Sequence, residues 1–96
     1  MVLLRRKKRV MATIPDIQLS STVYTDLYTV SGIPVGTEIL IQNKGPVVIV
    51  VQNSTLAPDN ASWNGFLIPY MAVWVAPSGT TGVWAKGGST VAVETR

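Results

Sequence analysis

The chain is short, rich in apolar residues and poor in charge. Its 96 residues allow one small domain. Apolar residues make up 47% and charged residues 14%, a balance that excludes an ordinary disordered protein. The sequence contains no cysteine and no histidine. Disulfide scaffolds, cysteine-based zinc sites, thiol chemistry and histidine-dependent catalytic triads are therefore excluded.

The net charge of +3 is unevenly distributed. One run near the start holds most of the basic side chains: Arg5, Arg6, Lys7, Lys8 and Arg9. From Met11 to Arg96 the acidic residues outnumber the basic ones, and the formal charge there is −2. We therefore divide the chain into a basic N-terminal arm, residues 1–10, and a mildly acidic domain, residues 11–96.

Three interpretations of the arm are open. It docks on an acidic surface of a neighbouring subunit, or it contacts nucleic acid, since clustered Lys and Arg release counterions from phosphate backbones. Alternatively, it is translated from an upstream start and Met11 is the native initiator. A signal peptide is not expected, because no apolar segment follows the charges.

The domain is predicted to be all-β, a single small antiparallel β-sandwich or a barrel-like fold. Gly, Pro, Asn and Ser recur every eight to twelve residues, and no helical spacing of apolar residues survives between them. We predict no helix. The expected strands are residues 14–19, 23–30, 38–42, 47–52, 66–68, 72–76, 82–85 and 90–94.

Hydrophobic patterning indicates which strands are buried. Residues 47–51 are apolar on both faces, which is typical of a central strand covered on two sides. This strand follows residues 39–41 through a turn at 43–46, in which Gly45 can take a positive φ. Residues 77–82 resemble a hairpin loop, and the alternation in 90–94 predicts a half-exposed strand.

A domain of this size buries only about 60% of its unfolded surface, so its core is marginal. Strands that are apolar on both faces, without disulfides, predict that contacts between subunits supply further burial. We therefore expect a homo-oligomer with cyclic symmetry. The longest apolar stretch, residues 65–76, contains Pro69 and is too short for a membrane helix, so no membrane partner is expected.

The sequence predicts no catalytic site, no metal site and no cofactor. The five carboxylates are scattered along the chain, whereas a paired-carboxylate mechanism needs two in one cleft. No histidine is present to activate a serine or threonine, and the lysines are expected in turns or in the arm. We expect a protein that is not an enzyme.

The tryptophans are the strongest candidates for contact residues. Trp63 lies in a polar loop with Asn60 and Asn64, and these three residues are predicted to contact a partner. The basic residues of the arm complete the predicted contact set. Trp74 and Trp84 sit inside apolar strands, where a place in the core or in a subunit interface is the commoner use.

The order of short motifs resembles that of small β-structured structural proteins of tailed bacteriophages. The motifs span residues 12–95 and fall at residues 24–28, 32–37, 39–43, 57–58, 64–69, 82–85 and 91–93. The resemblance implies a non-enzymatic virion subunit that cements or decorates the capsid, or forms part of the tail or the head-to-tail connector. Its implied partners are further copies of itself and capsid or tail proteins. The implied location is the virion, after synthesis in the host cytoplasm.

Two other functions remain as alternatives. A nucleic-acid-binding β-barrel would use the arm for backbone contacts and Trp63 for base stacking, although the acidic domain counts against it. A carbohydrate-binding module of a tail part would rest on the tryptophans alone.

Overall fold

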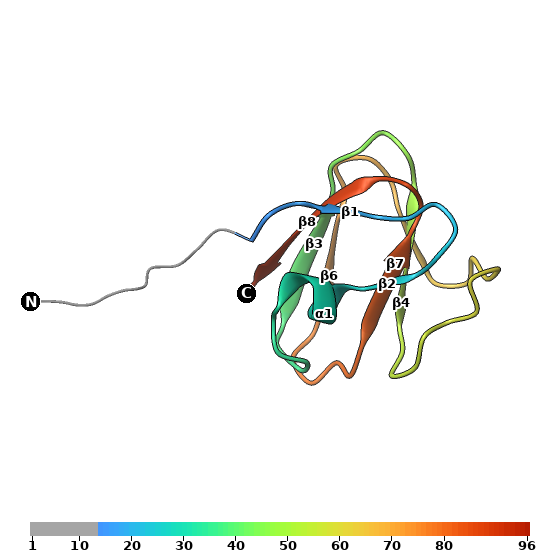
Figure 1. The fold of residues 1–96 in the computed structure, drawn as a ribbon. Helices are drawn as coiled ribbons and strands as arrows, with labels where there is room; N and C mark the ends of the chain where they lie inside the picture. The colour runs from blue at the N-terminus through green and yellow to red at the C-terminus, as the bar shows by residue number, and fades with distance from the viewer. Residues whose placement is uncertain (1–13) are drawn as a thin grey trace, which may run out of the picture.

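The fold is a sandwich of two antiparallel sheets (Figure 1), and the computed structural model describes residues 14–96. One sheet has the strand order β1-β8-β3-β6 and the other has the order β2-β7-β4-β5. The strands are β1 (Ile17–Gln18), β2 (Thr25–Asp26), β3 (Ile39–Asn43), β4 (Ile49–Asn53), β5 (Phe66–Ile68), β6 (Val73–Ala76), β7 (Val83–Lys86) and β8 (Thr90–Thr95). The prediction of a small all-β sandwich is confirmed.

The chain passes repeatedly from one sheet to the other. Within the described residues, β4 and β5 are the sole consecutive strands that pair with each other. One predicted connection is therefore wrong. The loop at 77–82 links β6 and β7 in different sheets, so it is not a hairpin. The predicted turn at 43–46 does join β3 to β4, but it passes from one sheet to the other. Sequence patterning marks a turn but carries no information on which sheet the next strand enters.

The core lies between the sheets and follows the two-residue period of the strands. In β3 the side chains of Ile39 and Ile41 are fully buried, and in β8 Val91 and Val93 alternate with exposed or half-buried neighbours, as predicted. The central strand β4 lies between β7 and β5, and Ile49, Val50 and Val51 are all fully buried. The prediction of a strand covered on both faces is confirmed for residues 49–51, whereas Val47 and Val48 precede β4 and are exposed.

A short helix replaces the second half of the strand predicted at 23–30. The helix α1 (Leu27–Ser31) begins where the Asp26 carboxylate accepts hydrogen bonds from the Tyr28 and Thr29 amides. It ends at Gly32, whose φ of 77° is a left-handed conformation that glycine adopts without steric cost. The prediction of no helix is wrong here, because the capping residues favour a helical turn over a continued strand.

Helix α1 contributes two large side chains to the core. Leu27 and Tyr28 are buried, and the Tyr28 hydroxyl donates a hydrogen bond to the Thr37 carbonyl at 2.7 Å. Burial raises the pKa of the Tyr28 phenol above its ordinary value of 10.0, and a backbone hydrogen bond at Gly36 offsets this only in part. The ionised form of this side chain is therefore disfavoured in the folded protein.

Alkaline pH is expected to destabilise the protein through Tyr28. Because the folded pKa is the higher one, the phenol ionises first in the unfolded chain, and stability is lost as pH rises above about 10. Tyr28→Phe is expected to flatten this alkaline loss while costing about 1 kcal/mol at neutral pH for the missing hydrogen bond. Urea denaturation across the pH range measures both effects. Tyr70→Phe, at an exposed tyrosine, is the control, and an equal flattening in both variants would refute the assignment.

Candidate functional site: a held loop and an apolar edge

The long connection between β4 and β5, residues 54–65, is held against the second sheet. At its start, the Ser54 amide donates to the Gly82 carbonyl at 3.0 Å, and the Ser54 carbonyl accepts from the Trp84 indole at 2.9 Å. At its end, Gly65 has a φ of 144°, and a Cβ there would lie 2.6 Å from the Val51 carbonyl oxygen. Both ends of the loop are thus fixed by close backbone approaches.

The middle of the loop packs on Lys86, the last residue of β7. This side chain is only 2% exposed, and its ammonium group donates to the Asn60 main-chain carbonyl. The ammonium also lies 4.6 Å from the centroid of the Trp63 ring and 5.1 Å from that of Tyr24. A buried charge is costly unless it is compensated, and here a carbonyl and two aromatic faces compensate it. We call Tyr24, Trp63 and Lys86 the lysine–aromatic cluster.

Further hydrogen bonds tie the cluster to its surroundings. The Tyr24 hydroxyl donates to the Ser62 carbonyl at 2.6 Å and accepts from the Gln52 amide at 3.0 Å. The Tyr24 main-chain amide donates to the Asn60 side-chain oxygen at 2.9 Å. The loop is therefore presented in one conformation, which lowers the entropy lost when a partner binds it.

The structure places the predicted contact residues in different environments. Asn60 is exposed, but its side-chain oxygen and its main-chain carbonyl accept the hydrogen bonds that hold the loop. Trp63 stacks on Lys86 but remains 51% exposed, and Asn64 is exposed beside it. The predicted contacts of Arg5, Arg6, Lys7, Lys8 and Arg9 lie outside the described residues.

The prediction that the domain lysines lie in turns is wrong for Lys86. It belongs to β7, where Val83 and Ala85 face the core and Trp84 and Lys86 face the opposite side. The predicted strand ended one residue too early, because a lysine followed by two glycines is typical of a turn. Tyr24 and Lys86 were not predicted to contact Trp63, because they lie far from it in the sequence and no local pattern links them.

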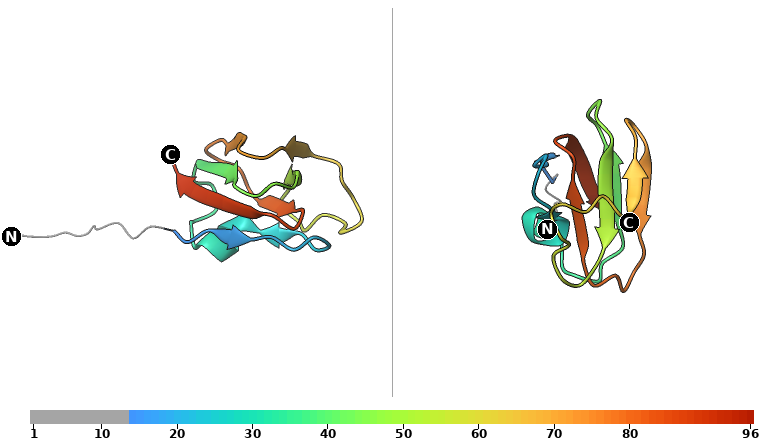
Figure 2. Two further views of the ribbon diagram at one scale, coloured as in Figure 1. Left: turned by 90° about the horizontal axis from the view of Figure 1, so that it is seen from above. Right: turned by 90° about the vertical axis from the view of Figure 1, so that its right-hand side faces the viewer.

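A second surface lies where the edge strands of the two sheets adjoin. β5 and β6 are each the last strand of their sheet and follow one another in the chain, and Figure 2 shows them along the same side of the sandwich. Five large side chains on this side are between 49% and 60% exposed. We call this region the apolar edge: Phe66, Leu67, Tyr70, Met71 and Val73. By register, Leu67 lies on the outer face of the second sheet and Val73 on the outer face of the first, so the region wraps around the edge of the sandwich.

The turn between β5 and β6 is held by the buried Asn43. The Asn43 amide group donates to the Ile68 carbonyl at 2.9 Å, and its main chain exchanges hydrogen bonds with Met71 and Ala72. Met71 has a φ of 69°, an uncommon conformation for a residue with a side chain. The turn therefore presents Tyr70 and Met71 to solvent from a fixed and strained backbone.

No predicted residue belongs to the apolar edge, although the sequence contains a signal for it. Residues 65–76 are the longest apolar stretch, and no charged residue occurs from Asn60 to Ala85. Within residues 14–96, no helix has the length and apolar character needed to cross a membrane. No group of three or more acidic, histidine or cysteine side chains in the same residues is arranged to hold a metal ion.

Comparison with known proteins yields no relative: no protein-family model, no curated protein and no solved structure matches this chain.

Proposed function

We propose that this chain is a non-enzymatic structural subunit of a tailed-bacteriophage virion. Its place is that of a capsid cement or decoration subunit, with a tail or head-to-tail connector position as the alternative. The observation that carries the proposal is the apolar edge, a surface of exposed aromatic, aliphatic and methionine side chains without charge. Exposed apolar patches of this kind mark surfaces that bind other proteins.

The held loop supports the same function. It offers Trp63, a residue type enriched in the energetic centres of interfaces, on a backbone that is already fixed before binding. A particle subunit binds through many copies at once, so a modest single contact becomes strong through effective concentration. We assign the apolar edge to contacts between copies and the loop to the neighbouring shell or tail protein.

Trp63→Ala is expected to weaken attachment to the particle about tenfold, as loss of an interface tryptophan does. It is also expected to cost about 1 kcal/mol of stability, because one aromatic face over Lys86 is lost. The measurement is co-sedimentation of added protein with particles from a phage whose gene for this chain is disrupted.

Leu56→Ala is the matched control. Leu56 is exposed in the same loop, and it makes no hydrogen bond or cation–π contact with the lysine–aromatic cluster. Equal binding by wild type and Trp63→Ala would remove Trp63 from the contact. Particles that bind neither the wild type nor the control would refute the proposed function.

A further inference from the structure

The chain contains four asparagines, and all of them lie within the described residues: Asn43, Asn53, Asn60 and Asn64. An asparagine loses its side-chain amide spontaneously when the main-chain nitrogen of the next residue attacks its Cγ. The reaction therefore needs two groups that are free of other bonds, the carboxamide and the amide of the following residue. The hydrogen bonds of the fold decide which asparagine meets both conditions.

Three of the four asparagines are blocked. After Asn43, Asn53 and Asn60, the next amide is already a hydrogen-bond donor, and its nitrogen could attack only once that bond is broken. The bonds run from Lys44 to the Thr90 carbonyl at 2.8 Å, from Ser54 to the Gly82 carbonyl at 3.0 Å and from Ala61 to the Asp59 carboxylate at 3.0 Å. Each such bond is expected to slow the attack about fivefold.

Of these four residues, Asn64 alone meets both conditions. Its side chain is exposed and makes no hydrogen bond within the part of the chain that the structure describes. The Gly65 amide donates to no acceptor in residues 14–96. Asn64 donates its own main-chain amide to the Ser62 hydroxyl at 3.2 Å, but the reaction does not involve that nitrogen. Because glycine has no Cβ to hinder the approach of its nitrogen, the path to the Asn64 carboxamide is open.

The fold itself requires the glycine that follows Asn64. Gly65 has a φ of 144°, and a Cβ there would lie 2.6 Å from the Val51 carbonyl oxygen and 2.9 Å from Cγ of Gln52. A larger residue would therefore disturb the entry into β5. The packing that fixes the end of the loop also keeps the reactive Asn64–Gly65 pair.

We propose that Asn64 is a site of spontaneous deamidation, which converts the held loop into a negatively charged form. The Gly65 nitrogen forms a bond to Cγ of Asn64, and the bond from Cγ to Nδ2 breaks. Nδ2 leaves as ammonia with the proton of the Gly65 amide, which closes a succinimide ring. Water then opens the ring at Cγ to give aspartate, or at the main-chain carbonyl to give isoaspartate. The net change is water taken up and ammonia released.

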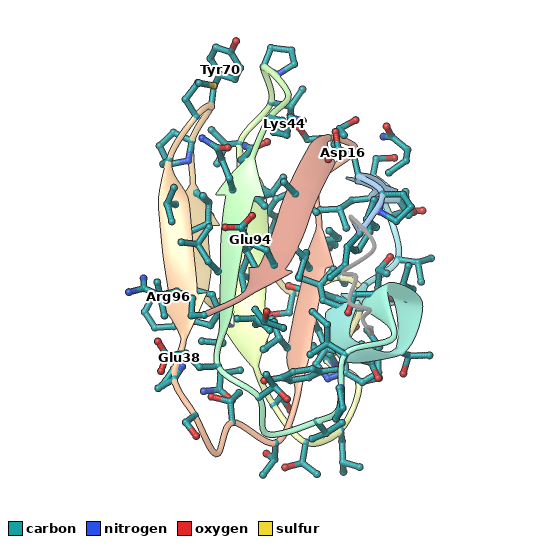
Figure 3. All side chains as sticks on the ribbon, turned by 90° about the vertical axis from the view of Figure 1, so that its left-hand side faces the viewer. Asp16, Glu38, Lys44, Tyr70, Glu94 and Arg96 are labelled. Carbon is teal, nitrogen blue, oxygen red and sulfur yellow. The ribbon has the colours of Figure 1, made fainter. Side chains whose placement is uncertain are left out.

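The product places a charge where this part of the chain has none. No charged residue occurs from Asn60 to Ala85. Figure 3 shows Glu94 on β8 and the ion pair of Asp16 and Lys44, whose charged atoms lie 2.7 Å apart, all outside that segment. The reaction therefore changes the character of the loop and does not merely add to an existing cluster of acids.

The new charge adjoins both surfaces that the proposed function uses. Asn64 follows Trp63 directly and lies two residues before Phe66 of the apolar edge. A partner seated on either surface would have to bury the carboxylate, which is costly without a counter-charge. The reaction does not depend on the proposed function, whereas this consequence rests on it: deamidation is expected to weaken attachment to the particle.

Peptide mapping by mass spectrometry tests the reaction on the full chain, incubated both folded and unfolded in guanidinium at the same neutral pH. In the folded protein, Asn64 is expected to react at least about tenfold faster than Asn53 or Asn60. Unfolding is expected to accelerate the reaction at Asn53 and Asn60 and to change it little at Asn64. An Asn64 that stays unmodified, or that folding protects as strongly as it protects Asn53, would overturn the proposal.

Two variants separate the reaction from its consequence. Asn64→Gln keeps a neutral amide but would need a larger ring to react, so it is expected to stay unmodified. Asn64→Asp carries the charge from the start and is expected to bind about tenfold less tightly than Asn64→Gln in the co-sedimentation assay above. Equal binding by the two variants would overturn the consequence for attachment. Particles that bind neither wild type nor Asn64→Gln would refute the proposed function, and the mapping result would stand independently.

Discussion

Asn43→Ala is expected to lower the free energy of unfolding by about 3 kcal/mol, one of the two largest effects of any single substitution considered. The Asn43 side chain is fully buried and uses both donors and its acceptor. It donates to the Val47 and Ile68 carbonyls and accepts from the Gly45 amide and the Ser89 hydroxyl. Alanine would leave these groups buried without partners.

Urea denaturation measures this loss, and Asn64→Ala is the matched control. Asn64 is exposed and its side chain makes no hydrogen bond within the described residues, so the same truncation there is expected to change stability by less than about 0.5 kcal/mol. Hydrogen exchange is also expected to rise at Met71 and Ala72, whose backbone groups bond to Asn43. Asn43 lies in β3 and bonds to Ile68 in β5, so it links the two sheets. Similar stability of Asn43→Ala and Asn64→Ala would show that this link does not stabilise the fold.

Lys86→Ala is expected to cost about 2 kcal/mol and to release the loop at 54–65. The substitution removes the hydrogen bond to the Asn60 carbonyl, both cation–π contacts, and the aliphatic stem that packs below the loop. Lys86→Met keeps the stem and removes the charge, so it is expected to recover about half of the loss. Urea denaturation gives the stability, and hydrogen exchange follows the loop.

Lys44→Ala is the control for Lys86, because Lys44 is an exposed lysine in an ion pair with Asp16. Exposed ion pairs contribute little, and the expected change is below about 1 kcal/mol. A loop that stays protected in Lys86→Ala would mean that the anchors at Ser54 and Gly65 suffice without the lysine–aromatic cluster.

Much of the fold could be predicted from local patterning. Both predicted bounds of the strand at 66–68 match those of β5. The bounds of β3, β6, β7 and β8 differ from the predicted ones by one residue at one or both ends. These strands combine β-branched or aromatic residues with clear turn signals at both ends. The segment 14–19 shrinks to the two residues of β1, because pairing with β8 extends only from Ile17 to Gln18.

Helix α1 was missed although its signals are local: capping at Asp26 and Gly32 outweighs the β-propensity of the helix's own residues Tyr28, Thr29 and Val30. Other features depend on tertiary contacts that patterning does not encode. Gly45 was predicted to take a positive φ, but its role is steric. A Cβ there would lie 2.0 Å from the Ser89 hydroxyl, across the fold. Such close approaches between distant segments appear only in the folded chain.

The candidate site was predicted in part. Trp63 is half exposed in the polar loop where the sequence places it, and its role as a contact residue stays a prediction. The sequence could not show that Asn60 holds the loop through hydrogen bonds to Tyr24 and Lys86, because these residues lie 36 and 26 positions away from it. The apolar edge arises because the topology makes both β5 and β6 terminal strands, and strand order is not encoded in local periodicity.

We propose that a tailed bacteriophage encodes this chain, and quantitative mass spectrometry of gradient-purified particles of that phage tests the proposed structural role most directly. Peptides from residues 14–96 are expected at a fixed ratio to the major capsid or tail protein, and they are expected to persist through high-salt washing. Particles that lack the chain, while the infected cell lysate contains it in quantity, would contradict the account.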